Sequence, residues 1–230
     1  MKIEQTIKIA VDAIVFGYTN QTIHVLLIKQ KLGQLKNQWA LVGGFVKNGE
    51  TLTKAVKREL QEEAGIEVDY MEQLYTFGDD VNRDPRFQVI SVTYFALVNS
   101  TNLTLTADTD AEEAQWFPVN ELPELAYDHK EIVQLAKERL QRKLTYQPIG
   151  FDLLPTKFLF SDLERLYCSI LEQEIDRRNF RKKMLSYGVI EETEEYAPQK
   201  SGRPAKLFRF NKQKYMELSM ESSGYKIDFV

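Results

Sequence analysis

The sequence has little of what stabilises secreted proteins or anchors membrane proteins. Its 230 residues include one cysteine and two histidines, which excludes an internal disulfide, a thiolate-rich metal site and a histidine-based zinc site. The longest apolar stretch near the start, residues 7–16, is interrupted by Lys8 and Asp12 and is too short to span a membrane. It also has neither a basic leader nor a small-residue cleavage site. We therefore expect a strand here, and a cytoplasmic protein without membrane contact.

No strong excess of charge of one sign is present either, but the charges are unevenly distributed. Residues 1–150 carry 16 basic and 21 acidic side chains, whereas residues 151–230 carry 14 and 13, with the basic residues clustered. Such clustering matters more than the net charge of -4 when the partner is a polyanion. With 43% hydrophobic residues, the chain is long enough for two domains, each with its own core.

The first part of the chain has the pattern of strands interrupted by one strong helix. Partly alternating apolar runs predict strands at residues 7–16, 23–28, 70–77 and 89–98, with a turn at residues 17–21. Residues 51–64 have a helical pattern and are followed by Gly65, a typical C-terminal cap. A second helix is predicted over residues 129–144. This pattern predicts an α+β fold. His24 then lies in a strand and His129 at the start of a helix, so we expect structural roles for both.

The second part of the chain begins after a stretch that is poor in helix formers. Residues 145–154 contain Pro148 and Gly150, so we predict one domain over residues 1–147 and another over residues 148–230. Cys168 lies among apolar side chains of the second domain and is expected to be buried as a small hydrophobic residue.

The second domain is predicted to contain two helices followed by a β-hairpin. A capping box at residues 161–164 starts the first helix at Asp162, and Asp176 caps the second, which Gly188 closes. Residues 189–193 and 206–210 have strand patterns and flank a loop at residues 199–204. This order is typical of a winged helix-turn-helix.

One segment of the first domain contains glycines and carboxylates at spacings that suit a metal site. On a helix, Glu59, Glu62 and Glu63 project from one face within an arc of about 100°. Converging carboxylates suit Mg²⁺ or Mn²⁺, which take further ligands from phosphates and activate a bound water. Three glutamates alone would more simply form a solvated helix face. The seven fixed positions that favour a site are Gly44, Glu50, Arg58, Glu59, Glu62, Glu63 and Gly65.

The residues around the three glutamates also suit a metal and diphosphate site. Arg58 can hold nearby carboxylates through bidentate hydrogen bonds, and we count it with Glu62 and Glu63 among the catalytic residues. Gly43 and Gly44 allow a substrate to approach the backbone closely.

These residues resemble the Nudix box, which implies a Nudix α/β/α sandwich with a mixed sheet that binds a nucleoside diphosphate. Residues 76–86 are similar to a loop of Nudix proteins that handle ADP-ribose, so Arg83 and Arg86 are candidates for phosphate contact; the alternative is surface charge. Residues 112–117 resemble the Nudix loop that can supply an acidic catalytic residue, for which Glu113 is the candidate. Trp116 belongs to the same segment, and the alternative to a functional role for it is packing in the core.

The basic residues of the second domain form a pattern typical of duplex DNA binding. Five of the seven residues at 177–183 are basic, and residues 196–216 contain no acidic side chain. On a helix and a wing, such charges can clamp phosphates while others reach base edges. The alternative is a solvated basic surface on an assembly domain. The candidate DNA-binding residues are Arg177, Arg178, Asn179, Arg181, Lys182, Lys200, Arg203 and Lys206.

The whole chain resembles the Nudix-related transcriptional regulators that control NAD or sugar metabolism in bacteria. The resemblance rests on the Nudix region and on residues 126–129, 148–151, 178–182 and 202–205. It implies a homodimer on a palindromic DNA operator, with ADP-ribose or a sugar as effector. Because the box is complete, two hypotheses stay open. One is a regulator that senses, and can also hydrolyse, its ligand; the other is an ADP-ribose pyrophosphatase whose C-terminal domain serves assembly.

Overall fold

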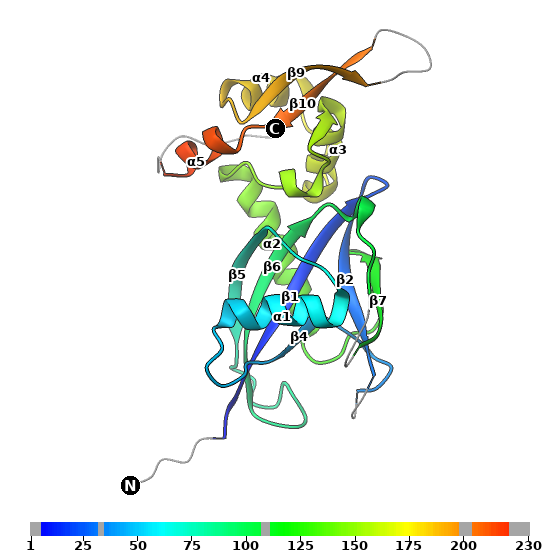
Figure 1. The fold of residues 1–230 in the computed structure, drawn as a ribbon, viewed down its shortest axis with the longest axis vertical. Helices are drawn as coiled ribbons and strands as arrows, with labels where there is room; N and C mark the ends of the chain where they lie inside the picture. The colour runs from blue at the N-terminus through cyan, green and yellow to red at the C-terminus, as the bar shows by residue number, and fades with distance from the viewer. Residues whose placement is uncertain (1–5, 32–34, 107–110, 198–203, 221–230) are drawn as a thin grey trace. The chain divides into compact units, whose positions relative to one another are not determined.

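The computed structural model describes residues 6–31, 35–106, 111–197 and 204–220 (Figure 1). Its contacts divide the chain into two compact units. The first contains Met1–Thr19 and Ile23–Ala136, and the second contains Asn20–Thr22 and Lys137–Val230. The division falls within one helix, upstream of the boundary at residues 147/148 that we predicted from proline and glycine. None of the described helices is long and apolar enough to cross a membrane.

The first unit is built on a mixed sheet of seven strands in the described residues. The strand order is β3-β2-β1-β6-β5, while β4 pairs with β1 and β7 pairs with β2. The pairing of β1 with β6 is parallel, whereas the pairings β1–β4, β2–β3, β2–β7 and β5–β6 are antiparallel. This confirms the predicted α+β class. The strands are β1 (Lys8–Thr19), β2 (Thr22–Gln30), β3 (Trp39–Ala40), β4 (Val42–Phe45), β5 (Tyr70–Phe77), β6 (Val89–Val98) and β7 (Ala111–Pro118).

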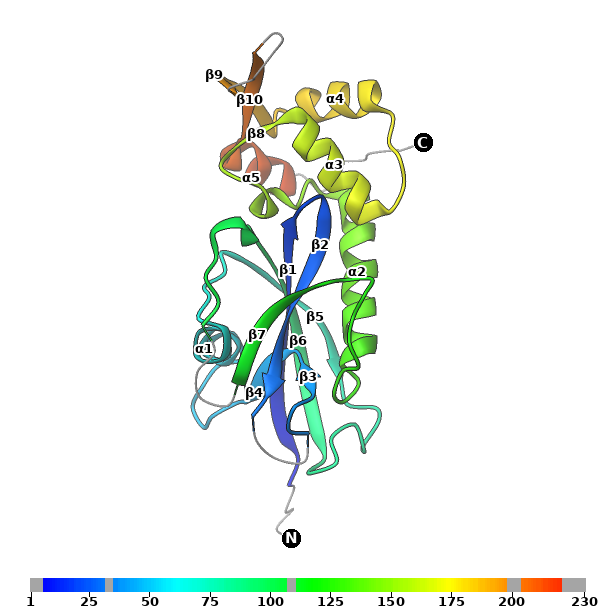
Figure 2. The ribbon, with the colours of Figure 1, turned by 90° about the vertical axis from the view of Figure 1, so that its right-hand side faces the viewer.

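Two helices cover opposite faces of this sheet, the second with its residues up to Ala136, which belong to the first unit, as Figures 1 and 2 show together. Helix α1 (Leu52–Ala64) begins one residue after the start of the predicted helix at residues 51–64, and α2 (His129–Tyr146) extends the predicted helix by two residues. A short 3-10 helix, η1 (Ser100–Asn102), follows β6. The first unit is therefore the predicted α/β/α sandwich.

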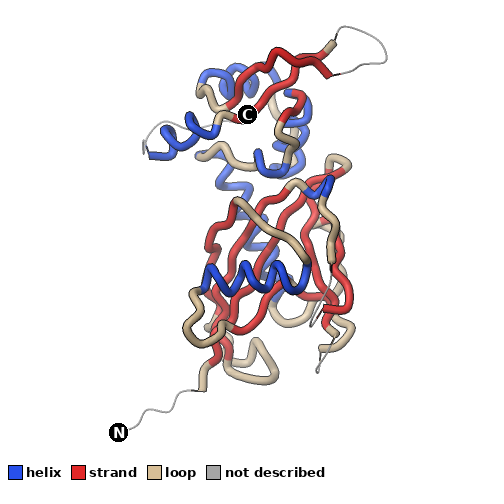
Figure 3. The backbone as a smooth tube through the Cα atoms, in the orientation of Figure 1, coloured by secondary structure: helices blue, strands red, loops and turns tan. Residues whose placement is uncertain are grey.

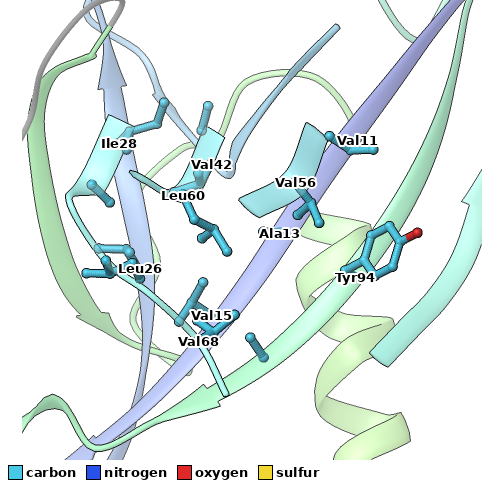
Figure 4. Packing of buried hydrophobic residues seen from close by; sticks show 14 of the residues in the cluster. Val11, Ala13, Val15, Leu26, Ile28, Val42, Val56, Leu60, Val68 and Tyr94 are labelled. Carbon is cyan, nitrogen blue, oxygen red and sulfur yellow. The ribbon is translucent and has the colours of Figure 1, made fainter. Parts of the chain in front are cut away.

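The core explains why β1 is apolar on both sides. Val11, Ala13 and Val15 belong to the cluster that includes Val56 and Leu60 of α1 (Figure 4). Because neighbouring side chains on a strand point to opposite faces, the buried residues between them face the other layer. Each fully buried aliphatic side chain contributes about 1.5–3 kcal/mol, so both layers hold β1 in place.

The turn between β1 and β2 is tighter than the sequence predicted. We expected a turn over residues 17–21, but β1 continues to Thr19 and only Asn20 and Gln21 form the turn, with φ of 49° and 61°. Two residues with positive φ match the right-handed twist of a hairpin. Apolar packing of β1 therefore extends the strand past Gly17.

The second unit contains the predicted winged helix-turn-helix (Figure 3). Its three-stranded sheet in the described residues has the order β8-β10-β9, and all its pairings are antiparallel. Residues 198–203, which include most of the predicted loop, lie outside the described residues. The elements after α2 are η2 (Phe151–Leu153), β8 (Lys157–Leu159), α3 (Phe160–Leu171), α4 (Arg177–Ser186), β9 (Ile190–Ala197), β10 (Ala205–Phe210) and α5 (Lys212–Met220).

Helix α3 begins earlier than the predicted capping box. Its first residue is Phe160, and Asp162 accepts a hydrogen bond from the backbone N–H of Leu159 at 3.1 Å. The cause is that β8 runs directly into α3, which places Phe160 in the domain core. Asp162 thus caps the helix from its third residue. Cys168, predicted to be buried, is half-buried on this helix, and burial raises the pKa of its thiol.

Candidate functional site

Helix α1 is delimited by caps that the sequence contains. The Thr51 hydroxyl accepts from the N–H of Lys54 at 3.3 Å, and Gly65 ends the helix with φ of 66°. Between these caps, Glu59 and Glu63 are buried and Glu62 is more exposed, with a side chain 37% accessible. The helix therefore directs its carboxylates toward the sheet rather than into solvent.

Arg58 connects these carboxylates. Its Nε and Nη2 donate to the two oxygens of Glu50 at 2.8 and 3.0 Å. Its Nη1 donates to Glu59 at 2.6 Å and to Glu62 at 3.0 Å, and Nη2 also reaches the carbonyl of Phe45 at 3.3 Å. Every nitrogen of the guanidinium group is thus used within the protein. The structure places Arg58 as an organiser of the acidic groups.

The two glycines of β4 let α1 approach the strand closely. The N–H of Gly43 donates to Oε2 of Glu63 at 2.9 Å. A Cβ on Gly43 would overlap the carbonyl oxygen of Val11, and a Cβ on Gly44 would overlap the carboxylate of Glu59. Side chains at these positions would therefore separate the strand from its neighbours.

The electrostatics differ between the two ends of the Arg58 network. Hydrogen bonds from Arg58 and from the Lys47 N–H lower the pKa of Glu50 to about 2. Burial raises the pKa of Glu59, although its hydrogen bond with Arg58 opposes this. The charge on Glu59 is thus only partly compensated, and a second cation beside it would be stabilised.

The donor set of this cleft fits a divalent metal such as Mg²⁺ or Mn²⁺. Glu59, Glu62 and Glu63 line the same cleft and offer hard carboxylate oxygens. Within the described ranges, however, no three His, Cys, Asp or Glu side chains are arranged so that they could hold a metal ion together. In this structure Arg58 and the Gly43 N–H donate hydrogen bonds to oxygens of all three glutamates.

The cleft has a volume of about 380 Å³ and gathers most of the residues predicted for the site. Glu113 is the exception, because it lies exposed on β7, paired in register with Lys29, and does not line this cleft. The described cleft therefore gives the predicted catalytic role of Glu113 no support. The predicted residues that line it are Gly43, Gly44, Arg58, Glu59, Glu62, Glu63, Arg83 and Arg86.

Arg83 lines the cleft, but its guanidinium group is paired with carboxylates inside the protein. Its Nε and Nη2 donate to the two oxygens of Asp128 at 2.8 and 2.6 Å, and Nη2 lies 3.7 Å from Asp12. The side chain is only 5% exposed. Burial lowers the pKa of Arg83, but the hydrogen bond with Asp128 and the charge of Asp12 outweigh it and raise the pKa. Two of the donors expected to meet phosphate are thus committed to an internal ion pair.

Arg86 is the more accessible arginine of the cleft. It donates from Nε and Nη2 to Asp84 at 3.0 and 2.8 Å, and its guanidinium lies over the rings of Phe45 and Tyr127 at 5.5 and 5.7 Å. Its side chain is 40% exposed. A planar cation between two aromatic rings at a cleft wall suits a ligand that is both aromatic and anionic.

Among the cleft residues that were not predicted as site residues are Asp12, Tyr127 and His129. Asp12 of β1 accepts a hydrogen bond from Ser91 and lies 3.7 Å from Nε2 of His129. Nδ1 of His129 accepts from the N–H of Leu41 at 2.9 Å, and burial lowers the pKa of this imidazole. Tyr127 has a positive φ of 56° beside them. The sequence signals for this group were the polar Asp12 inside an apolar strand and the family resemblance at residues 126–129.

The second unit presents the predicted basic helix. Asp176 accepts from the N–H groups of Arg178 and Asn179, each at 2.9 Å, which caps α4 as predicted. Phe180 and Met184 are buried and fix one face of the helix. Arg178, Asn179 and Lys182 are exposed, so a polyanion can reach them.

The other candidate DNA-binding residues differ in their surroundings. Arg177 lies 3.2 Å from Glu164, and both Arg181 and Lys206 pair with one glutamate of β9. The strand β9 contains four glutamates, Glu191, Glu192, Glu194 and Glu195, whose proximity to the basic strand was not predicted. Lys200 and Arg203 lie outside the described residues.

Comparisons with known proteins match both units. The family described as NUDIX domain matches residues 6–136, and that described as NrtR DNA-binding winged helix domain matches residues 150–210. The ADPR responsive transcriptional repressor NtrR of Acinetobacter baylyi is 33% identical over 209 residues, which are 89% of this chain and 82% of the relative.

Solved structures agree with this assignment. The crystal structure of Shewanella oneidensis NrtR complexed with a 27mer DNA is 27% identical, with a TM-score of 0.76 over 90% of this chain and 95% of that one. The NUDIX domain of the same protein complexed with ADP ribose is 31% identical, with a TM-score of 0.55 over 60% of this chain and 90% of that one. This chain therefore belongs to the Nudix family, among the members that join a Nudix domain to an NrtR DNA-binding winged helix domain.

Proposed function

We propose that this chain is a transcriptional repressor whose affinity for its DNA operator is set by ADP-ribose, or a related nucleoside diphosphate, in the Nudix cleft. The observation that carries the proposal is the joint match of both units to a relative named as ADPR responsive, over 89% of this chain. We also propose residues 1–147 and 148–230 as the two domains. The chain acts as a homodimer, because a palindromic operator requires two symmetric copies of α4.

Recognition of DNA is assigned to α4. Its N-terminal turn is capped by Asp176, so the backbone there is ordered before DNA arrives. Arg178 and Lys182 lie one helical turn apart on the exposed side, and Asn179 lies beside them. Arginine can pair with guanine and asparagine with adenine in the major groove, while lysine contacts phosphates. Arg178 and Asn179 would therefore recognise bases, while Lys182 would add affinity through the phosphates.

Recognition of the ligand is assigned to the cleft of the first unit. Arg86, between Phe45 and Tyr127, supports binding of a group that is aromatic and anionic. A diphosphate would be repelled by Glu59, Glu62 and Glu63, so its binding there requires a cation. Those glutamates would hold Mg²⁺ or Mn²⁺, which supplies positive charge to a diphosphate when bound. Gly43 and Gly44 keep the backbone close to that position.

The complete acidic motif favours a second candidate function, hydrolysis of ADP-ribose to AMP and ribose 5-phosphate. In this function Glu62, the most exposed of the three glutamates, is suited to accept a proton from the attacking water. Arg58 would position Glu59 and Glu62 through the hydrogen bonds already described. Sensing and hydrolysis would use the same cleft. A ligand that is bound there can change the affinity for DNA whether or not it is hydrolysed.

The repressor function is tested by selecting bound duplexes from a pool of random sequence and measuring the affinity of the selected duplex with and without ADP-ribose and Mg²⁺. We expect strong binding that decreases steeply with salt and weakens when ADP-ribose is added. Arg178→Ala should reduce affinity, whereas Arg142→Ala, which changes an exposed arginine of α2, should leave it unchanged. Failure to enrich any duplex would overturn the proposal.

Hydrolysis is tested separately by incubating the protein with ADP-ribose and Mg²⁺ or Mn²⁺ and measuring AMP. Glu62→Gln and Glu63→Gln should abolish AMP release while the far-ultraviolet circular dichroism stays unchanged. If the wild-type protein produces no AMP above background yet releases DNA on addition of ADP-ribose, the cleft is a sensor only.

A further inference from the structure

Glu192 contacts both of the basic elements that the winged domain offers to DNA. One of its carboxylate oxygens lies 3.7 Å from Nη2 of Arg181 on α4, and the other lies 3.0 Å from Nζ of Lys206 on β10. All three side chains are partly exposed, at 45%, 44% and 32% respectively. One acidic group thus joins the helix and the wing at the surface where phosphates are expected.

Arg181 is held in place by more than this ion pair. Its guanidinium lies 5.1 Å from the ring centroid of Phe160 and 5.2 Å from that of Phe208, and these rings pack edge to face. Phe208 is the cross-strand partner of Glu192. Arg181 therefore rests on the buried core of the domain, and the Glu192 carboxylate holds the guanidinium from one side.

The same carboxylate also reduces the positive charge available to any polyanion. Arg181 and Lys206 carry two positive charges, and Glu192 offsets one of them. The hydrogen bond that Lys206 donates to Glu192 raises the pKa of Lys206, so the lysine stays charged. Glu195 on the same strand pairs with Lys157 of β8, and Glu191 pairs with Arg209. Only Glu192 on this strand pairs with α4 among the described residues.

We propose that Glu192 is a specificity-determining residue of the DNA-binding surface: it weakens binding to arbitrary duplexes while holding Arg181 in the orientation that operator recognition uses. The inference rests on the proposed DNA-binding function. Binding to arbitrary DNA depends on counterion release by free cations, which Glu192 reduces. Binding to an operator depends on fixed geometry, which Glu192 supports. Discrimination against wrong partners commonly uses such an unfavourable charge.

The test compares Glu192→Gln with wild type on the selected duplex and on a shuffled duplex of equal length and composition. Glutamine keeps the shape of the side chain and removes its charge. We expect affinity for the shuffled duplex to rise roughly two- to fivefold, the effect of about one exposed ion pair. The slope of log affinity against log salt should steepen by roughly 0.9 for each phosphate newly contacted. Affinity for the selected duplex should change less, so the ratio of the two affinities falls.

Glu195→Gln is the matched control, because it removes the same charge from the same strand but loses its partner on β8 rather than on α4. Its effect on the affinity ratio should be smaller. If Glu192→Gln and Glu195→Gln behave alike, or if Glu192→Gln raises both affinities equally, the inference is overturned. Glu192→Ala should show the same fall in the ratio. If wild type does not distinguish the two duplexes, the proposed function itself fails.

Discussion

The ion pair between Arg83 and Asp128 offers a sharp test of how the ligand cleft is built. Asp128→Asn removes the charge but leaves a side chain that can begin a helix as well as aspartate does. Removing one partner of a buried pair costs about 3–5 kcal/mol because the other charge stays buried. Arg83 is 5% exposed and Asp128 19%, and Asp12 remains 3.7 Å from the guanidinium. We therefore expect the lower end, about 3 kcal/mol.

The assay is urea denaturation followed by tryptophan fluorescence. Both tryptophans, Trp39 and Trp116, lie in the first unit, so their emission reports the stability of the unit that contains the ion pair. Glu112→Gln is the control, because it removes an exposed carboxylate of β7 in the same unit and should cost less than about 0.5 kcal/mol. A loss below about 1 kcal/mol for Asp128→Asn would refute the view that Arg83 is held by a buried charge.

Two further predictions concern the same cleft. Gly43→Ala should destabilise the first unit more than Gly44→Ala, because the added methyl group meets backbone in the first case and a side chain in the second. Thermal unfolding of both variants ranks them, and the reverse order would contradict this. His129 has a lowered pKa, so below about pH 6.5 the unfolded chain binds a proton that the native imidazole does not. The unfolding free energy should therefore fall as the pH decreases through this range, and the melting temperature of His129→Gln should fall less between pH 7.5 and 5.5. Equal slopes for the two proteins would exclude His129 as the cause.

Local signals in the sequence were enough for the elements of the site. The caps Thr51 and Gly65 define α1, and the spacing of Glu59, Glu62 and Glu63 places them on one face. The same holds for α4, because the Asp176 cap depends only on neighbouring residues. Such features are predictable because their hydrogen bonds connect residues two to four positions apart.

Contacts between distant segments were decided only by the tertiary structure. Asp12, Arg83 and Asp128 come from three separate parts of the chain, and no spacing rule connects them. For this reason Arg83 was predicted to face phosphate, whereas two of its donors meet Asp128 instead. Glu192 and Arg181 are likewise joined only when β9 packs beside α4.

The sequence by itself determined the longer helices and strands, the C-terminal cap of α1, the N-terminal cap of α4, and which side chains share a helix face. The tertiary structure decided which charges are buried, which arginines are already paired, and which carboxylates pair with the basic residues of the winged domain. The physical reason is that helix periodicity and capping arise from neighbours in the chain. The burial and pairing of a charge depend instead on residues that only folding brings within a few ångströms.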